Sequence, residues 1–216
     1  MLRSRRHAHR TASGQAAAAL ALLVLLLVLP GAALAGDPIG RVVQQEGAVT
    51  VQRAEDRVPL WPGDPVFVAD RVLTGPDGRV RIAFLDESLL AIGSDSEVAV
   101  DDYRIGRDGR RLNAVISLLL GIVRAAITPA APSVVFDVRT RVAVASARST
   151  DWVVEAKPDH TAVFVAEGRV AVTASGGQIL LGPGLGTDVM AGRAPASPKR
   201  WGEARVRDVM GRTALE

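Results

Sequence analysis

Apolar and polar residues alternate along much of this chain, and the alternation is clearest at residues 79–84. Every second residue of that segment is apolar: Val80, Ile82 and Phe84. Successive side chains of a strand point to opposite faces, so this spacing predicts a half-buried β-strand. Residues 75–78 (GPDG) before it and 86–88 (DES) after it are turn sequences. Residues 72–100 therefore predict three strands joined by two turns.

Similar segments recur on both sides of residues 72–100. They are short, rich in valine, isoleucine and aromatic residues, and separated by glycine, proline, aspartate or serine. They lie at residues 39–43, 48–51, 134–136, 142–144, 152–154, 161–166, 169–174 and 178–181. Many short strands at short intervals predict an all-β domain, which is either a sandwich or a solenoid-like stack of short antiparallel strands.

Two segments have more than one interpretation. Residues 112–120 are apolar enough for a helix, but Gly121 and the apolar residues after it favour two strands around that glycine. Residues 201–215 carry a ragged apolar stripe, which predicts either a short C-terminal helix or a loose tail. Residues 193–198 contain two prolines and are interpreted as the linker to that segment.

One short motif occurs twice. Residues 46–51 (EGAVTV) are echoed by residues 167–172 (EGRVAV), and residues 121–123 (GIV) form a weaker third copy. The spacing is irregular, so the chain is not a fixed-period repeat array. A glycine followed by alternating valines is what a turn leading into a strand requires.

The first 35 residues follow a different pattern. An arginine-rich start precedes an apolar run of 14 residues, Ala16 to Leu29, and Ala33-Leu34-Ala35 follows it. This order is typical of a secretory signal peptide cleaved after Ala35. The alternative is a retained membrane anchor, but the run is shorter than the ~20 residues that span a bilayer. We therefore expect residues 1–35 to direct export to the periplasm or the medium, and a membrane contact only if this leader is retained.

Removing the leader changes the charge of the chain. The whole chain has a net charge of +3, but the leader holds four of its 26 basic residues and none of its 23 acidic ones, which leaves 22 against 23. A nearly neutral domain lacks the positive charge on which nucleic-acid binding depends, so we expect no nucleic-acid partner. The absence of cysteine excludes disulfides, thiolate chemistry and a lipid-modified cysteine anchor.

The residue types that carry catalysis are sparse. His160 is the only histidine after the leader and follows a predicted turn, so we expect it to be an exposed turn residue. Acidic residues near residues 86–87, 95 and 101–102 lack the spacing of a calcium loop and are expected to serve turns. No Gly-x-Ser-x-Gly nucleophile turn occurs. We predict no enzyme activity, no catalytic residue, no metal site and no cofactor.

Arginines and tryptophans are the remaining candidates for binding. Four arginines crowd one predicted loop and are named as a candidate partner-binding site: Arg104, Arg107, Arg110 and Arg111. A second group contains Arg139, Arg141 and Arg148. Guanidinium groups suit carboxylate or phosphate partners, although a solvated loop also explains such clusters. The tryptophans, Trp61, Trp152 and Trp201, are expected to pack in the core or under a lid.

Several short motifs follow one another in an order typical of a known family. They are Gly47-x-Val49-x-Val51, Gly63-Asp64, residues 70–80, Ile82-x-Phe84-x-Asp86-x-Ser88, residues 93–98, residues 146–152 and Glu167-Gly168-x-Val170-x-Val172. This order resembles the FecR-type periplasmic signalling domain and extends over residues 36–192. Glu87 and Ser149 stand where glycine is usual in that family, and Arg141 stands where proline is usual.

The resemblance implies a domain outside the cytoplasmic membrane that relays a signal or binds a partner without catalysis. Regulators of the family also carry a cytoplasmic helical segment that holds a sigma factor. Only 15 residues precede the apolar run here, so we expect a stand-alone exported form.

Two functions stay open. The first is binding of an envelope protein or outer-membrane component, in envelope signalling; the second is a carbohydrate- or lipid-binding module that uses the tryptophans and arginines.

Overall fold

The computed structural model describes residues 36–129 and 134–215, and in this part of the chain it confirms the all-β prediction. Within these described residues, seventeen strands pair into one mixed, mostly antiparallel sheet, and one short helix lies near the C-terminus. The predicted signal peptide, residues 1–35, lies outside the described residues. Within the described ranges, no helix is long and apolar enough to cross a membrane.

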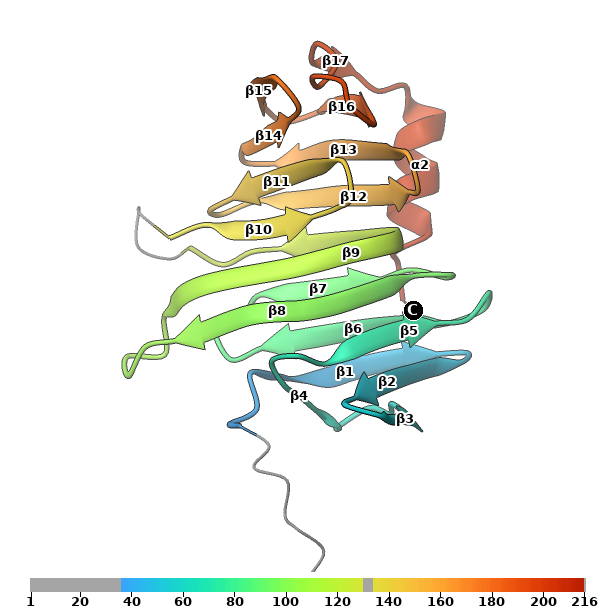
Figure 1. Ribbon diagram of the computed structural model, residues 1–216, viewed down its shortest axis with the longest axis vertical. Helices are drawn as coiled ribbons and strands as arrows, with labels where there is room; N and C mark the ends of the chain where they lie inside the picture. The colour runs from blue at the N-terminus through green and yellow to red at the C-terminus, as the bar shows by residue number, and fades with distance from the viewer. Residues whose placement is uncertain (1–35, 130–133, 216) are drawn as a thin grey trace, which may run out of the picture. The chain divides into compact units, whose positions relative to one another are not determined.

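The continuous sheet folds into two layers, which we call sheet A and sheet B (Figure 1). Sheet A contains, in spatial order, β4 (Pro65–Val66), β1 (Gly40–Glu46), β6 (Arg79–Phe84), β7 (Leu89–Ile92), the second part of β9 (Arg111–Ala126), β12 (Asp151–Lys157), β13 (His160–Glu167), β16 (Leu185–Met190) and β17 (Lys199–Arg200). Sheet B contains β3 (Asp56–Pro59), β2 (Val49–Arg53), β5 (Arg71–Thr74), β8 (Glu97–Ile105), the first part of β9, β10 (Phe136–Arg139), β11 (Ala143–Ala147), β14 (Val170–Ala174) and β15 (Gly177–Leu181). Among the described strands, only β9 and β10 pair in parallel.

The chain crosses between the two layers at glycines of the repeated motif. Gly47 (φ +58°) and Gly168 (φ +81°) lead from sheet A into sheet B, and Gly121 (φ +94°) leads from sheet B into sheet A. A Cβ on Gly168 would lie 2.5 Å from the carbonyl oxygen of Ser149. Left-handed backbone and this close approach both require glycine, so the repeated motif marks corners of the fold.

The prediction of two strands around Gly121 needs correction. β9 is one continuous strand, Arg111–Ala126, whose first part pairs with β8 and β10 and whose second part pairs with β7 and β12. A Cβ at Gly121 would lie 2.1 Å from the Ser96 hydroxyl oxygen, so the strand bends there against a neighbouring turn. The glycine is therefore a bend within a strand that joins the layers, and no loop interrupts the pairing.

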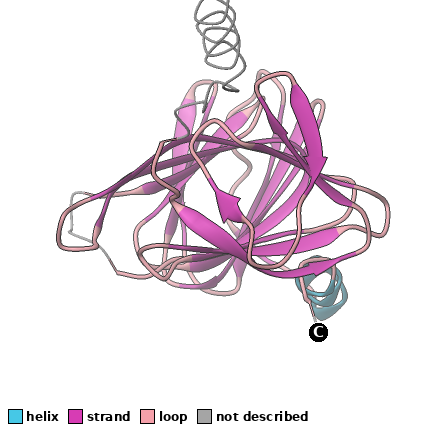
Figure 2. Ribbon diagram, turned by 90° about the horizontal axis from the view of Figure 1, so that it is seen from below, coloured by secondary structure: helices cyan, strands magenta, loops and turns pink. Residues whose placement is uncertain are grey.

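The main hydrophobic core lies between the two sheets. Figure 2 looks along the stack and shows strands on both sides of this interior. Val80, Ile82 and Phe84 are all buried in this core, as the alternation predicted. The Phe84 ring stacks on Tyr103 of β8, with the ring centroids 4.2 Å apart. Because both sheets supply alternate residues to one interior, the layers fix the position of each other.

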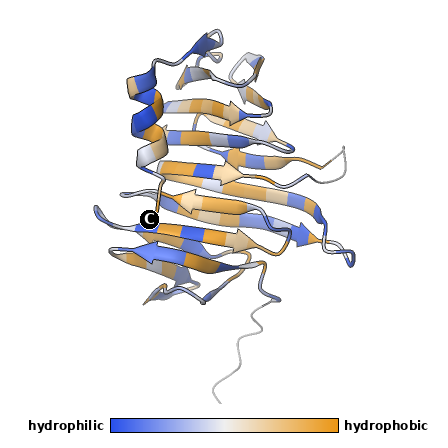
Figure 3. Cartoon of the chain, turned by 180° about the vertical axis from the view of Figure 1, so that it is seen from behind, coloured by the Kyte–Doolittle hydropathy of each residue, from blue (hydrophilic) through white to orange (hydrophobic). Residues whose placement is uncertain are grey.

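A second, smaller core lies on the outer face of sheet A under α2 (Glu203–Gly211), which confirms the predicted short C-terminal helix. Its apolar residues are Ile122, Val153, Ala162, Phe164, Trp201 and Val209. Figure 3 shows α2 alongside the strands of sheet A. The segment predicted as a linker is bonded to the fold: the amide of Ala196 donates to the carbonyl of Asp188 at 3.0 Å, and β17 follows it.

Candidate partner-binding site

The arginine loop predicted from the sequence is the hairpin between β8 and β9. Arg104, Arg107 and Arg110 are exposed there. The Arg104 guanidinium lies 3.3 Å from a carboxylate oxygen of Asp102, and that of Arg110 lies 4.0 Å from Asp108. Exposed pairs of this kind are weak. These three arginines therefore face solvent on one hairpin, and their role in partner binding stays a prediction.

Arg111 does not lie on the exposed surface of the hairpin, contrary to the prediction. Its side chain is buried and forms an ion pair with Asp86, also donating to the Ser88 hydroxyl at 2.9 Å. Its second terminal nitrogen donates to the backbone carbonyls of Thr128 and Arg148, each at 3.3 Å. The buried Arg111 side chain has a structural role, because its bonds join the turn at residues 86–88 to the segment after β9 and to the turn before β12, although its Nε has no hydrogen-bond partner among the described residues.

Tyr103 extends this buried network. Its hydroxyl donates to Asp86 at 2.8 Å, while the Arg111 guanidinium lies over the Phe136 ring at 5.6 Å from the centroid. Burial, together with the neighbouring Asp86 carboxylate, raises the pKa of Tyr103 far above its ordinary value. Tyr103 therefore keeps its proton and acts as a hydrogen-bond donor.

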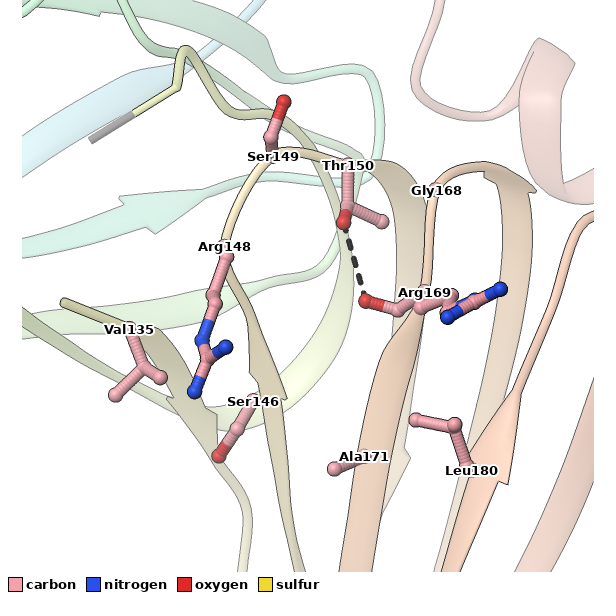
Figure 4. A pocket seen from close by; sticks show the side chains of 9 residues that line it. All are labelled: Val135, Ser146, Arg148, Ser149, Thr150, Gly168, Arg169, Ala171 and Leu180. Atoms are coloured by element: carbon pink, nitrogen blue, oxygen red, sulfur yellow. Dashed lines mark hydrogen bonds between the residues drawn. The ribbon is translucent and has the colours of Figure 1, made fainter. Parts of the chain in front are cut away.

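A groove lined by two arginines lies on the outer face of sheet B. It has a volume of about 630 Å³. Its lining comes from β11, β14, β15, the segment before β10 and the turns that precede β12 and β14: Val135, Ser146, Arg148, Ser149, Thr150, Gly168, Arg169, Ala171 and Leu180. We call it the arginine groove. Figure 4 shows Arg148 and Arg169 on the two turns at one end, with Ser146, Ala171 and Leu180 farther along.

The turns that carry the two arginines are fastened together. The Thr150 hydroxyl donates to the backbone carbonyl of Arg169 at 3.1 Å, as Figure 4 shows. Gly168 lets the turns approach so closely, since any side chain there would collide with Ser149 and Thr150. Arg111 holds the carbonyl of Arg148 from inside the core. The backbone of both arginines is therefore fixed, while their side chains extend into the groove.

The electrostatics of the arginine groove favour an anionic partner. Arg148 and Arg169 are exposed, and neither guanidinium forms an ion pair or a hydrogen bond within the described part of the chain. Among the described residues that line it there is no aspartate, glutamate or histidine. The Ser146 hydroxyl donates to Asp137 at 2.7 Å and lacks a neighbouring base. The groove can thus bind carboxylate or phosphate groups but has no arrangement for acid–base or nucleophilic catalysis.

Arg148 belongs to the second arginine group of the sequence, but no sequence signal joins it to Arg169. The two residues are brought together by the antiparallel pairing of β11 with β14, in which Ala147 lies opposite Val170. The other two arginines of the predicted second group do not line the groove with Arg148. Arg139 lies 3.8 Å from Asp137, and Arg141 is exposed at the turn between β10 and β11.

His160 is not the exposed turn residue predicted from the sequence. Its ring is about one-fifth exposed and lies 3.0 Å from Asp188 of β16. Arg205 of α2 contacts the same carboxylate at 2.6 Å, and Lys199 lies 3.6 Å from it. The hydrogen bond from Arg205 lowers the pKa of Asp188 to about 2. This cluster fastens α2 to sheet A, and no nucleophile belongs to it.

The tryptophans do not form a sugar-binding platform. Trp152 is buried in the main core and Trp201 in the second core, as predicted. Trp61 differs, because 58% of it is exposed. Trp201 stacks on Phe164 with ring centroids 5.2 Å apart, and the Arg205 guanidinium lies 3.5 Å from the Trp201 ring centroid. A module built on these three tryptophans would have a single exposed ring.

The prediction that the acidic residues serve turns holds for Asp86 but not for Asp101 and Asp102, which lie within β8 and bond to β9. Asp101 accepts a hydrogen bond from Ser117, and Asp102 accepts one from Asn113. Asp86 accepts one from the amide of Ser88 in the turn before β7. In the residues that the structure describes, no group of three or more His, Asp or Glu side chains is arranged to hold a metal ion.

Residues 70–171 match the family model described as FecR protein. The chain contains a FecR domain. FecR domains are typically non-catalytic. The FecR domain contains Arg148, Arg169 and the buried pair of Arg111 and Asp86, whereas Leu180 of the groove lies beyond the matched residues.

Two solved structures have a similar fold. Both are crystal structures of a protein described as "a putative anti-sigma factor from Parabacteroides distasonis ATCC 8503". They superpose with TM-scores of 0.53 and 0.51, each at 16% sequence identity over 63% of this chain. The match spans 62% of the length of each of those chains, and at this identity it concerns the fold alone. No curated protein matches the chain.

Proposed function

We propose that this chain is exported and that its FecR domain binds a protein partner in the cell envelope, without catalysing a reaction. The observation that carries the proposal is the arginine groove, where Arg148 and Arg169 have no acidic neighbour among the described lining residues. Two guanidiniums carried by fixed turns, without an ion pair among the described residues, suit carboxylate groups on a partner surface. Binding through the groove requires no change in the main core, because the groove lies on the outer face of sheet B.

A role in signalling is supported by the FecR domain and by the likeness of its fold to the structures of "a putative anti-sigma factor". In this proposal the domain acts through a protein–protein contact outside the cytoplasm. Export is supported by the arginine-rich start, the apolar run and the Ala33-Leu34-Ala35 sequence of the leader.

The binding proposal is tested by reversing charge in the groove. The double variant Arg148→Glu, Arg169→Glu should lose capture of a protein from an envelope fraction that the wild type captures, and its melting temperature should stay unchanged because both side chains are exposed. Arg141→Glu is the matched control, since Arg141 is exposed on the same sheet but outside the groove. Equal capture by the wild type and the groove variant would contradict the proposal.

Export is tested by the N-terminus of the protein that cells produce. Mass analysis of protein recovered from the envelope or the medium should give an N-terminus at Gly36, because cleavage is expected after Ala35. An intact Met1 in the membrane fraction would instead indicate a retained anchor. This result is independent of the groove variants, so export and partner binding are decided separately.

A further inference from the structure

The strands at the four edges of the two sheets differ in how they are protected. β4 and β17 have two residues each, with Pro65 in the first and Lys199 in the second. β3 carries Asp56 and Arg57 and ends at Pro59. Short length, charge and proline are the means by which natural proteins keep sheet edges from pairing with other chains. β15 (GQILL) has five residues and contains none of these features.

The backbone of β15 is paired on one side only. Its residues face β14 in antiparallel register, with Ala171 opposite Leu180 and Thr173 opposite Gln178, and no other strand pairs with it in the described part of the chain. In such an edge strand, alternate N–H and C=O groups point away from the sheet. Leu181 is buried, whereas Gln178 and Leu180 face solvent, and Leu180 is 59% exposed. This edge can therefore accept another strand.

The surroundings of β15 decide what kind of strand fits. Two arginines lie near the C-terminal end of β15. Arg169 directly precedes Val170, the residue opposite Leu181, and the Arg200 side chain lies next to Gly184 in the loop after β15. Arg193 precedes Ala194, which lies beside Gly177 at the start of β15. All three arginines are exposed. Two copies of this chain joined edge to edge would bring these positive charges together, so charge complementarity favours an acidic strand from a different protein.

We propose that β15 is a docking strand that pairs with an extended acidic segment of the protein partner. This inference rests on the proposed function and names the mode of binding. Backbone hydrogen bonds to β15 provide the affinity of strand addition, and contacts with Leu180, Gln178 and the surrounding arginines provide its specificity. Leu180 also lines the arginine groove, so the added strand lies beside the groove.

The test uses a defined probe, a short peptide of alternating glutamate and valine, with the purified chain. Binding should slow amide hydrogen exchange at residues 177–181 of β15. An analogue methylated at alternate backbone nitrogens should bind roughly tenfold more weakly or worse, because it cannot complete the ladder of hydrogen bonds. A lysine–valine peptide should fail to protect β15, since its charge repels the three arginines.

The matched variant is Gln178→Glu with Leu180→Glu. Both side chains face solvent, so the fold should be kept, and the new charges guard the edge. The variant should lose binding of the glutamate–valine peptide roughly tenfold or more and should gain binding of the lysine–valine peptide. Arg141→Glu is the control, because Arg141 is exposed at the turn between β10 and β11, outside the groove, and should leave peptide protection of β15 intact.

Four outcomes would overturn the proposal. They are equal binding of the methylated analogue, equal protection of β15 by the lysine–valine peptide, unchanged peptide binding by the β15 variant, and a wild-type dimer in sedimentation that the β15 variant abolishes, which would assign the edge to a second copy. The docking strand and the proposed function can be contradicted separately. A partner that is lost with the groove variant but kept with the β15 variant contradicts only the docking strand. If no envelope partner exists, the peptide experiment still decides whether the edge accepts an acidic strand.

Discussion

At the scale of single residues, turn geometry shows where this chain departs from the FecR pattern. Glu87 stands where glycine is usual, and its φ of +65° places it in the left-handed region. A residue with a side chain is disfavoured there by about 1–2 kcal/mol. Ser149 also replaces a usual glycine, but it is not among the residues with positive φ. The residue that replaces glycine is therefore strained at position 87 but not at position 149.

This difference predicts opposite effects of restoring glycine. Glu87→Gly should raise the free energy of unfolding by about 0.5–1 kcal/mol, because relief of the left-handed conformation exceeds the entropy that glycine loses on folding. Ser149→Gly should lower it by about 0.5–1 kcal/mol, since only the entropy cost applies. Urea unfolding of both variants measures the two changes. Stabilisation by both substitutions, or by neither, would show that φ at residue 87 does not control stability.

Arg111 shows that residue type alone does not predict burial in this chain. Its place in the sequence RDGRR indicated a solvated loop. The register of β8 with β9 shifts between Arg104 and Ile105, where Ile105 lies opposite Arg111. Such a bulge changes which residues face inward. Arg111 consequently lies in the core while Leu112 is 57% exposed, the reverse of what their polarity predicts.

A buried charge that loses its partner should be costly. Arg111→Met leaves the Asp86 carboxylate buried without its counter-charge, so the free energy of unfolding should fall by about 3–5 kcal/mol. Arg110→Met, on the exposed part of the same hairpin, should change it by less than about 0.5 kcal/mol. Adding Asp86→Asn to Arg111→Met should recover part of the loss. A loss below about 1 kcal/mol in the single variant, measured in urea, would refute the structural role of the pair.

At the scale of elements, the sequence predicted strands well because their alternation and turn glycines are local signals. Val80, Ile82 and Phe84 point into the core as expected, and the repeated glycine motif coincides with the corners between layers. The arginine groove could not be predicted, because it depends on the pairing of β11 with β14 across an intervening hairpin. Periodicity assigns a residue to a face of a strand but does not say which strands are neighbours.

The attachment of α2 depends equally on contacts between distant segments. His160 begins β13, Asp188 lies in β16 and Arg205 lies in the helix, and the three side chains meet at one carboxylate. Arg212 adds a second contact at 2.9 Å to Glu155 of β12. The Pro158-Asp159 turn beside His160 predicted an exposed residue, but the carboxylate that His160 contacts lies 28 residues farther along the chain.

The lowered pKa of Asp188 gives this attachment a defined pH dependence. An aspartate titrates near pH 3.9 in an unfolded chain, whereas the pKa of Asp188 in the folded chain is about 2. The ionised carboxylate therefore stabilises the fold above about pH 4, and this contribution disappears as the pH falls from about 4 to about 2. Because the site is partly exposed to solvent, the contribution is on the order of 1 kcal/mol.

The prediction is tested with Asp188→Asn. Its unfolding free energy should be lower than that of the wild type at neutral pH, and the two should converge between about pH 4 and pH 2, because the wild-type carboxylate is then protonated. Asp159→Asn is the control, since Asp159 is exposed in the neighbouring turn and has no ion pair within the described residues. A gap between wild type and Asp188→Asn that stays constant down to pH 2 would contradict the assignment.

At the scale of the whole molecule, two cores of different size share sheet A. The main core lies between the sheets and includes Ile82, Trp152 and Val172, whereas the second core lies outside sheet A and depends on residues after β16. The residues of β12 and β13 alternate between them: Val154 and Val163 face the main core, and Val153 and Phe164 face the second. Strands that are buried on both faces carry continuous apolar runs, which explains why residues 161–166 show no alternation.

Removing residues 199–216 should separate the contributions of the two cores. The main core keeps all its residues, so the β-sheet spectrum should persist. Loss of the apolar burial provided by Trp201 and Val209 should lower the free energy of unfolding by about 3–6 kcal/mol. The exposed face around Phe164 should then bind a hydrophobic dye and promote association. Adding Phe164→Ser should abolish dye binding while the sheet is kept.

A truncated chain with unchanged stability and no dye binding would show that α2 does not protect an apolar face. Complete unfolding of the truncated chain would show that the two cores are one cooperative unit.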